Sequence, residues 1–211
     1  MIDIIPAVLE HSVDDLRVAL ERLRGASATV QIDMVGSDFL KNEESLPLWD
    51  EFDFEFDLML PHPEQHVEHC IELGASRIIV HARDKGAHEA LLLLQHLRGG
   101  SFATEVGIAL AVDETPRALD AFEGLYDYVQ VMGIAHEGSQ GQTFDERALA
   151  LVQHIHALHP AYIIQVDGGL RTRHVRALVD VGASRLVAGS AILNADNPRA
   201  AYEALVKEAN Q

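Results

Sequence analysis

Two stretches carry most of the information about the architecture of this chain: Gln165-Val166-Asp167-Gly168-Gly169 and Val187-Ala188-Gly189-Ser190. Each lies at the end of a short apolar run rich in β-branched residues, Tyr162–Val166 and Ser184–Ala188, and such runs are typical of buried parallel strands. Both runs break into glycine where a loop should begin. The sequence therefore predicts two neighbouring parallel strands whose loops start with glycine.

The glycines of these two loops indicate an anion site. Glycine lets backbone N–H groups approach an anion closely, and the residues that follow, Arg171–Val181 and Asn197–Ala209, have helical periodicity. The N-terminal end of a helix attracts phosphate. A single glycine pair after a strand more often only turns the chain. Two such turns in adjacent units favour a phosphate site beside the carboxylate of Asp167.

Strand and helix patterns alternate along the whole chain. The predicted strands are Ile2–Val8, Ala28–Met34, Phe54–Leu60, Arg77–Ala82, Val106–Ala111, Tyr128–Gly133, Tyr162–Val166 and Ser184–Ala188. The predicted helices are Ser12–Arg24, Glu44–Trp49, Pro63–Leu73, Ala87–Arg98, Thr115–Phe122, Asp145–Leu158, Arg171–Val181 and Pro198–Ala209. Eight such units in 211 residues favour a closed (β/α)8 TIM barrel over an open doubly wound sheet. No linker divides the chain, so residues 1–211 are predicted to form a single domain.

The composition is that of an ordinary globular protein, with 48% hydrophobic residues and a mean hydropathy of +0.04. A net charge of −17 predicts repulsion from nucleic acid and from anionic membrane surfaces. The run Leu91–Leu94 is far too short to span a bilayer, and the start, Met1-Ile2-Asp3-Ile4-Ile5-Pro6, carries no basic segment followed by a long apolar one. We therefore expect a soluble, cytoplasmic protein. Barrels of this size often associate, so a homo-oligomer is expected, with Trp49 and Phe52 on the covered face.

One cysteine and twelve histidines bear on redox and metal chemistry. Cys70 is the single cysteine, which excludes an internal disulfide, and its helical context predicts a buried structural thiol. His66 and His69 share a helix face, but nothing near them completes a metal site, so a solvated face is the preferred interpretation. Seven histidines are expected mostly at the surface: His62, His66, His69, His88, His96, His154 and His156.

Polar side chains interrupt three apolar strands near their carboxyl ends, where the loops of a barrel carry its chemistry. Alternation that buries Ile32 in one direction turns Gln31 and Asp33 toward the barrel mouth, and Asp57 and Asp167 occupy comparable positions. A buried carboxylate without partners is costly, so several together imply a cation, shared protons or compensating hydrogen bonds. Each one alone is more simply a capped loop start. Together they indicate a site.

Several blocks of the sequence carry a resemblance to one family. They are Ile5-Pro6-Ala7-Val8-Leu9, Ile32-Asp33 with Phe39 downstream, Asp57-Leu58-Met59, Val80-His81, Val131-Met132, Gly141-Gln142-Thr143-Phe144, Val166-Asp167-Gly168-Gly169 and Val187-Ala188-Gly189-Ser190-Ala191-Ile192. Over nearly its whole length the chain resembles the ribulose-phosphate 3-epimerase family. These are phosphate-binding barrels that invert a pentulose phosphate at the carbon beside its ketone. The last three blocks are the most specific.

The resemblance implies roles for individual residues. Asp33 and Asp167 match the two catalytic aspartates of the family, one removing a proton from one face of the sugar and the other returning it to the opposite face. The implied substrate is a small phosphorylated ketose. The residues expected to contact the sugar or its phosphate are Gly141, Gln142, Gly168, Gly169, Gly189, Ser190, Met59, Met132 and His81.

The metal site of the family is altered in this chain. In the family the two aspartates and two histidines also bind a divalent metal that polarises the ketone. Here Gln31 stands where the first histidine is expected, and Asp57 stands where the second is. If Gln31, Asp33, Asp57 and Asp167 bind an ion, this all-oxygen set predicts Mg2+ or Mn2+ rather than Zn2+. If they bind none, the enediolate loses its main electrophile and epimerisation is severely weakened.

Two further residues have two interpretations each. His81 either supplies a hydrogen-bond donor near the ketone or is a polar side chain packed under a loop. Glu137 lies in the loop from His136 to Gln142, which is one residue longer than the glycine-rich loop of the family. A carboxylate facing a phosphate is unfavourable. Glu137 therefore either points to solvent or indicates a sugar of different length or charge.

The leading hypothesis is an epimerase or isomerase that acts on a small phosphorylated ketose, with Asp33 and Asp167 as its acid and base. The alternative is a phosphosugar-binding barrel whose catalysis is lost or altered because the histidine ligands are replaced. Aldol cleavage or decarboxylation that depends on lysine has little support. None of Lys41, Lys85 and Lys207 ends a predicted strand.

Overall fold

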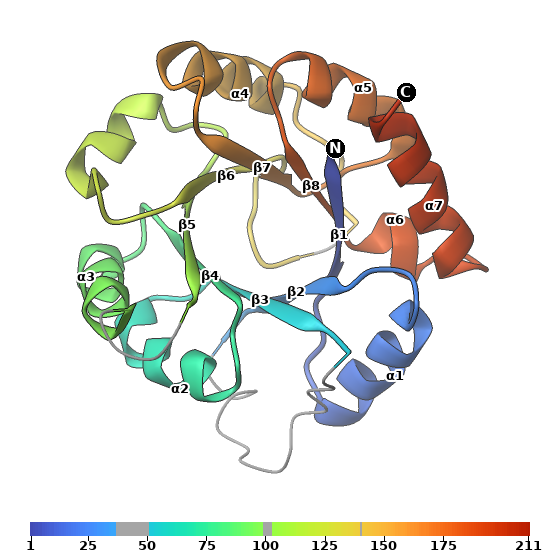
Figure 1. Ribbon diagram of the computed structural model, residues 1–211, viewed down its shortest axis with the longest axis horizontal. Coiled ribbons are helices and arrows are strands. Elements are labelled where there is room, and N and C mark those ends of the chain that lie inside the picture. The colour runs from blue at the N-terminus through green and yellow to red at the C-terminus, as the bar shows by residue number, and fades with distance from the viewer. Residues whose placement is uncertain (37–50, 99–102, 140) are drawn as a thin grey trace.

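Eight parallel strands close into a barrel, in the order in which they follow one another along the chain (Figure 1). They are β1 (Asp3–Val8), β2 (Thr29–Met34), β3 (Asp53–Leu58), β4 (Arg77–His81), β5 (Glu105–Leu110), β6 (Tyr128–Met132), β7 (Ile163–Asp167) and β8 (Arg185–Ala188). The barrel closes where β1 pairs with β8, with Ile4 opposite Leu186. This computed structural model describes residues 1–36, 51–98, 103–139 and 141–211. The predicted (β/α)8 TIM barrel is confirmed.

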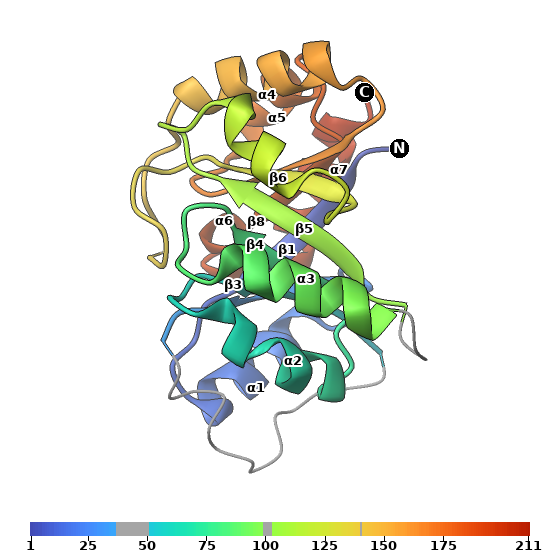
Figure 2. The same cartoon turned by 90° about the vertical axis from the view of Figure 1, so that its left-hand side faces the viewer.

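Helices surround the barrel (Figures 1 and 2). They are α1 (Val13–Leu23), η1 (Pro63–Gln65), α2 (Val67–Glu72), α3 (Ala87–Arg98), η2 (Pro116–Phe122), α4 (Arg147–Leu158), α5 (Thr172–Asp180), α6 (Ser190–Leu193) and α7 (Pro198–Ala209). Of the helices within the described ranges, none is both long enough and apolar enough to cross a membrane. The predicted helix Glu44–Trp49 lies outside the described residues, as do Phe39 and Lys41.

Local sequence explains how the helices form. Ser12 caps α1, because its hydroxyl accepts a hydrogen bond from the backbone N–H of Asp15 at 3.1 Å. The segment predicted as an α-helix at Thr115–Phe122 is instead the 3-10 helix η2. Its buried residues, Pro116, Leu119 and Phe122, are spaced by three, which matches the three residues per turn of a 3-10 helix. The short helix α6 was not predicted.

The side chains of each strand alternate between two cores. Outward residues, such as Val30, Ile32 and Met34 of β2, pack against the helices in the largest core cluster. Inside the barrel a smaller apolar cluster consists of Ile79, Ala109, Tyr128, Met132 and Ile134. Gly107 makes room for the ring of Tyr128, because a Cβ at this position would lie 2.5 Å from it. The barrel interior is therefore filled by side chains, as expected for eight strands.

Near the amino ends of the strands, the barrel interior holds a cluster of polar side chains that we call the polar floor. It consists of Glu55, Arg77, Glu105, Tyr128, Gln165 and Arg185. The Glu55 carboxylate accepts hydrogen bonds from Gln165 Nε2 at 2.7 Å and from the Tyr128 hydroxyl at 3.0 Å. Arg77 Nη1 lies 3.5 Å from Glu55, and Arg185 lies over the Tyr128 ring at 4.9 Å. Burial raises the pKa of Glu55.

Three predictions about individual side chains have different outcomes. Cys70 is buried in α2, and burial raises the pKa of its thiol to about 12, which confirms the predicted structural thiol. Phe52 was predicted to cover an oligomer face, and this is wrong. It is only 7% exposed because it packs into the core, edge to face against Phe54. Trp49 lies outside the described residues. The seven histidines expected at the surface are exposed or half-buried.

Candidate active site

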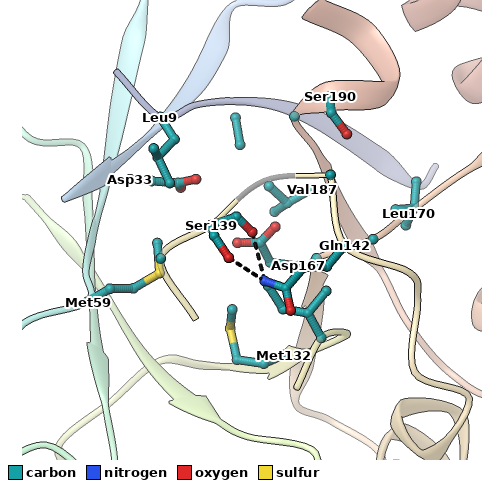
Figure 3. A pocket seen from close by; sticks show the side chains of 17 residues that line it. Leu9, Asp33, Met59, Met132, Ser139, Gln142, Asp167, Leu170, Val187 and Ser190 are labelled. Carbon is teal, nitrogen blue, oxygen red and sulfur yellow. Dashed lines mark hydrogen bonds between the residues drawn. The ribbon is translucent and has the colours of Figure 1, made fainter. Parts of the chain in front are cut away.

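A pocket opens at the carboxyl ends of the strands, under the loop that follows β6 (Figure 3). Ten residues singled out in the sequence line it: Asp33, Met59, Met132, Gly141, Gln142, Asp167, Gly168, Gly169, Gly189 and Ser190. Figure 3 shows the carboxylates of Asp33 and Asp167 turned toward the pocket from two different strands. The other three, Gln31, Asp57 and His81, are fully buried and lie deeper in the barrel. The strand ends thus bring distant parts of the chain to one place.

A single amide links the two aspartates. Gln31 Nε2 donates hydrogen bonds to Asp33 Oδ1 at 2.8 Å and to Asp167 Oδ2 at 2.9 Å. Its Oε1 faces the other way, toward Gln165 Nε2 at 3.4 Å. This orientation follows from charge, because an amide oxygen between two carboxylates would be repelled. Gln31 therefore serves as a donor that fixes both aspartates.

Asp57 is held from two sides. His81 Nε2 lies 2.7 Å from Asp57 Oδ1, and Gln130 Nε2 donates to Asp57 Oδ2 at 2.8 Å. The other ring nitrogen of His81 lies 3.3 Å from Glu137 Oε2. Burial opposes protonation of His81, but the Asp57 charge and the bonds to both carboxylates raise its pKa well above the usual value. His81 is thus packed beneath the β6–α4 loop, as one of the two interpretations proposed.

The contact with His81 also determines where the side chain of Glu137 points. The side chain of Glu137 is 20% exposed and turns toward the imidazole, so it does not line the pocket. Burial raises the pKa of Glu137, but the hydrogen bond and charge of His81 outweigh burial and lower it. Glu137 therefore does not point into open solvent, which was the first of its two interpretations. A sugar of different length or charge stays a prediction. No local pattern indicated this pairing, because His81 ends β4 and Glu137 lies in the loop that follows β6.

The carboxylates of the pocket hold protons more tightly than free aspartates do. Burial, and then the charges of Asp167 and Asp57, raise the pKa of Asp33 well above its usual value. Burial and the Asp57 charge raise the pKa of Asp167 to about 7. A carboxyl group with a pKa near 7 can both accept and donate a proton at neutral pH.

The raised pKa of Asp167 predicts a pH dependence of stability. Its pKa is about 7 in the folded protein and 3.8 without the protein environment, so protonation favours the folded state. This contribution is complete below pH 3.8 and is lost as the pH rises through about 7. In EDTA, the free energy of unfolding of the wild type should fall by roughly 2 kcal/mol relative to Asp167→Asn between pH 5 and pH 8. Urea denaturation measures this difference, and parallel pH profiles of the two proteins would contradict it.

The end of the pocket away from the methionines is built from backbone. Gly168 and Gly169 follow β7, and Gly189 and Ser190 lead from β8 into α6. Gly169 has a φ of +68°, and a Cβ there would lie 2.6 Å from the backbone nitrogen of Phe144. A side chain is therefore excluded by both conformation and space. Glycines without side chains let backbone N–H groups approach a phosphate group closely.

The loop between β6 and α4 covers the pocket and holds its own shape. Gln142 Nε2 donates to the carbonyl oxygen of Ser139 at 2.8 Å and to the hydroxyl of Ser139 at 2.7 Å, and it also bonds the carbonyl oxygen of His136. Gly138 packs against the side chain of Val35 at the end of β2. The loop thus reaches across the barrel mouth (Figure 2). Gln142 stabilises the conformation of the β6–α4 loop through these hydrogen bonds, and it also lines the pocket.

Three aspartates form a group that could hold a metal ion. One carboxylate oxygen from each of Asp33, Asp57 and Asp167 lies within 4.8 Å of the others. All three are oxygen ligands, and their crowding in a buried site favours a cation, as the raised pKa values of Asp33 and Asp167 also indicate. The residues present therefore fit a divalent metal. Gln31, the fourth predicted ligand, turns its amide nitrogen toward Asp33 and Asp167.

Some residues of the site were missed by sequence reasoning. Gln130 and Gln165 are fully buried inside the barrel and join Asp57, Gln31 and Glu55 into one hydrogen-bonded network. A signal was present, because both glutamines lie two residues before a pocket residue on the same strand. Side chains two apart on a strand point to the same face. Arg171, whose guanidinium reaches Ser190, had no comparable signal.

Comparison with known proteins identifies the family. A model of the ribulose-phosphate 3 epimerase family matches residues 4–193. The chain belongs to this family. It is 28% identical over 206 residues to the ribulose-phosphate 3-epimerase of Schizosaccharomyces pombe, covering 92% of this chain and 88% of that protein. It is 31% identical to the enzyme of the same name from Treponema pallidum, over 67% of this chain and 64% of that protein.

Solved structures support the architecture of this family member. KGPDC from Streptococcus mutans superposes with a TM-score of 0.73 at 15% identity, covering 99% of this chain and 98% of that one. A 3-hexulose-6-phosphate synthase superposes with a TM-score of 0.70 at 18% identity, covering 98% and 99%. At such low identities the likeness shows the barrel fold alone.

Proposed function

We propose that this protein is an epimerase of a small phosphorylated ketose, with ribulose 5-phosphate as the first candidate. The observation that carries the proposal is the pocket in which Asp33 and Asp167 lie beside the glycines that follow β7 and β8. Membership of the ribulose-phosphate 3 epimerase family supports the same reaction. We propose a pentulose phosphate as the substrate of this reaction.

The two aspartates would act as acid and base. The ionised aspartate removes the proton from the carbon beside the ketone, and the protonated aspartate delivers a proton to the opposite face. Gln31 holds both carboxyl groups in place through its amide hydrogens. Met59 and Met132 exclude water from the side of the pocket away from Ser190 (Figure 3). The phosphate, held by Gly168, Gly169, Gly189 and Ser190, fixes the sugar relative to the aspartates.

A divalent ion would complete this site. Asp33, Asp57 and Asp167 would hold it, and their oxygen ligands favour Mg2+ or Mn2+ over Zn2+. Such an ion supplies positive charge that stabilises the negative charge developing on the ketone oxygen. Asp57 is positioned for this role by His81 and Gln130, which hold its carboxylate in a fixed orientation.

Binding of Mn2+ should stabilise the folded protein in a pH-dependent way. Because the aspartates must be ionised to bind a cation, we expect 1 mM Mn2+ to raise the melting temperature at pH 8 and to have little effect at pH 5. Asp57→Asn should lose most of this stabilisation. Asp113→Asn, which removes a carboxylate of 65% exposure outside the pocket, is the matched control and should retain it. An equal shift in Asp57→Asn and the wild type would rule out the three-aspartate site.

Exchange of the substrate proton with solvent tests the reaction. The protein is incubated with ribulose 5-phosphate in D2O, with and without Mn2+, and deuterium at the carbon beside the ketone is followed by NMR. Incorporation together with formation of the second epimer is expected. Tight binding of the sugar phosphate without any deuterium uptake would instead establish a binding protein that has lost turnover. Neither binding nor exchange with any pentulose or hexulose phosphate would overturn the proposal.

We also propose the localisation, the oligomeric state and the domain organisation of this protein. We expect the protein to be cytoplasmic, since its substrate class is a charged metabolite. We expect it to form a homo-oligomer, although Phe52 is not part of the interface. Residues 1–211 are proposed to act as one domain, because the backbone N–H of Ile2 in the first segment bonds Asn210 Oδ1 in the last, at 3.0 Å.

A further inference from the structure

The anion end of the pocket contains no positive side chain. Among the described residues that line the pocket there is no lysine, arginine or histidine, and two are aspartates. The whole chain carries a net charge of −17. A phosphate dianion entering this pocket therefore meets neutral backbone donors within an unfavourable overall field. A positively charged side chain near this end of the pocket would make the binding of a phosphate dianion much more favourable.

One guanidinium reaches the rim of this end. Arg171 Nη1 donates a hydrogen bond to Ser190 Oγ at 3.2 Å and another to the carbonyl oxygen of Leu170 at 3.3 Å. Both acceptors are neutral, and both belong to residues that line the pocket. Other arginines of the chain, such as Arg77 and Arg185, are paired with carboxylates. The charge of Arg171 is thus held beside the pocket by partners that do not neutralise it.

The backbone of Arg171 is fixed relative to the anion site. Its N–H donates to His174 Nδ1 at 3.2 Å, and the His174 ring stacks on Phe144 at 4.6 Å between centroids. The backbone of Phe144 in turn packs directly against Gly169. One rigid unit therefore carries both a glycine of the anion site and the arginine. Such prior positioning lowers the entropic cost of binding.

We propose that Arg171 binds the phosphate group of the substrate together with Ser190, and thereby sets the preference for a phosphorylated over a free sugar. A guanidinium donates two parallel hydrogen bonds to phosphate oxygens. The Ser190 hydroxyl can accept from Arg171 and donate to the phosphate at the same time. This inference rests on the proposed function and adds the group that recognises the charge of its substrate.

Arg171→Gln and its matched control, Arg173→Gln, test this role. Both variants remove one positive charge, but Arg173 is exposed and does not line the pocket. Dissociation constants for inorganic phosphate are measured by 31P NMR at fixed ionic strength, and KM and kcat are measured with ribulose 5-phosphate. In Arg171→Gln we expect the phosphate dissociation constant and KM to rise about 10- to 100-fold, as for a hydrogen bond to a charged group. We expect kcat to change less than threefold.

The control and a second variant make the outcome specific. Arg173→Gln should stay within twofold of the wild type for both constants. Arg171→Lys keeps the charge but loses the planar fork, so an intermediate loss is expected even if Arg171→Gln folds poorly. Wild-type phosphate affinity in Arg171→Gln and Arg171→Lys, or an equal loss in Arg173→Gln, would overturn the inference while leaving the proposed function intact. A wild type that binds no phosphate and no sugar phosphate would overturn both.

Discussion

Asp33→Asn and Asp167→Asn are each expected to lower kcat for the epimerisation of ribulose 5-phosphate by about 100- to 10,000-fold, the usual contribution of a general acid or base. Asparagine keeps the shape of the side chain but cannot transfer the proton. Both carboxylates lie in the pocket and share the Gln31 amide. Steady-state assays measure the loss, and circular dichroism checks the fold.

The two aspartate variants should also differ from each other in a defined way. When one base is removed, the remaining aspartate still faces one side of the sugar carbon. Each variant should therefore exchange the substrate proton of one epimer with D2O, without inversion, and the two variants should select opposite epimers. Asp113→Asn is the control, because this carboxylate is 65% exposed and lies outside the pocket. Retention of more than a tenth of the wild-type kcat in both aspartate variants would refute the two-base mechanism.

Gln165→Met is expected to lower the free energy of unfolding by about 2–4 kcal/mol, because it leaves the buried carboxyl group of Glu55 with fewer hydrogen-bond donors. Methionine matches glutamine in length, so the change in packing is small. The lost hydrogen bonds are those from Gln165 Nε2 to Glu55 Oε1 at 2.7 Å and to Gln130 Oε1 at 2.8 Å. Chemical denaturation at pH 7 measures the effect.

A double-mutant cycle separates hydrogen bonding from packing. In a Glu55→Gln background the acceptor is neutral, so the cost of Gln165→Met should fall below half of its value in the wild type. The Tyr128 hydroxyl and Arg77 remain beside position 55 in every variant of the cycle. An equal cost in both backgrounds would mean that the polar floor stabilises the barrel by packing alone.

Much of the fold could be predicted because its determinants are local. Every strand of the barrel appeared as a short apolar run, and the glycines after β7 and β8 marked where loops begin. Alternation along β2 also placed Gln31 and Asp33 on the inner face. The error at η2 had a local cause as well. A spacing of three fits both helix types over seven residues.

The parts that could not be predicted depend on contacts between distant segments. Whether Gln31 presents its nitrogen or its oxygen is decided by the charges of Asp33 and Asp167. Asp167 lies 136 residues away from Gln31 along the chain. The contact between His81 and Glu137 likewise joins the end of β4 to the loop after β6. No periodicity within a single element carries such information. For the same reason Arg171, which acts through Ser190, was recognised only in the structure.

The shared amide of Gln31 has a consequence for the direction of turnover. Its two hydrogen bonds, at 2.8 and 2.9 Å, treat the two carboxyl groups almost equally. Epimers that differ at one carbon have similar free energies, so a catalyst that converts them must work about as well backward as forward. Because the Gln31 amide favours neither aspartate, either Asp33 or Asp167 can act first as the base. The site is thus arranged to interconvert the two epimers in both directions. The concentrations of the two sugars then set the direction of the net reaction.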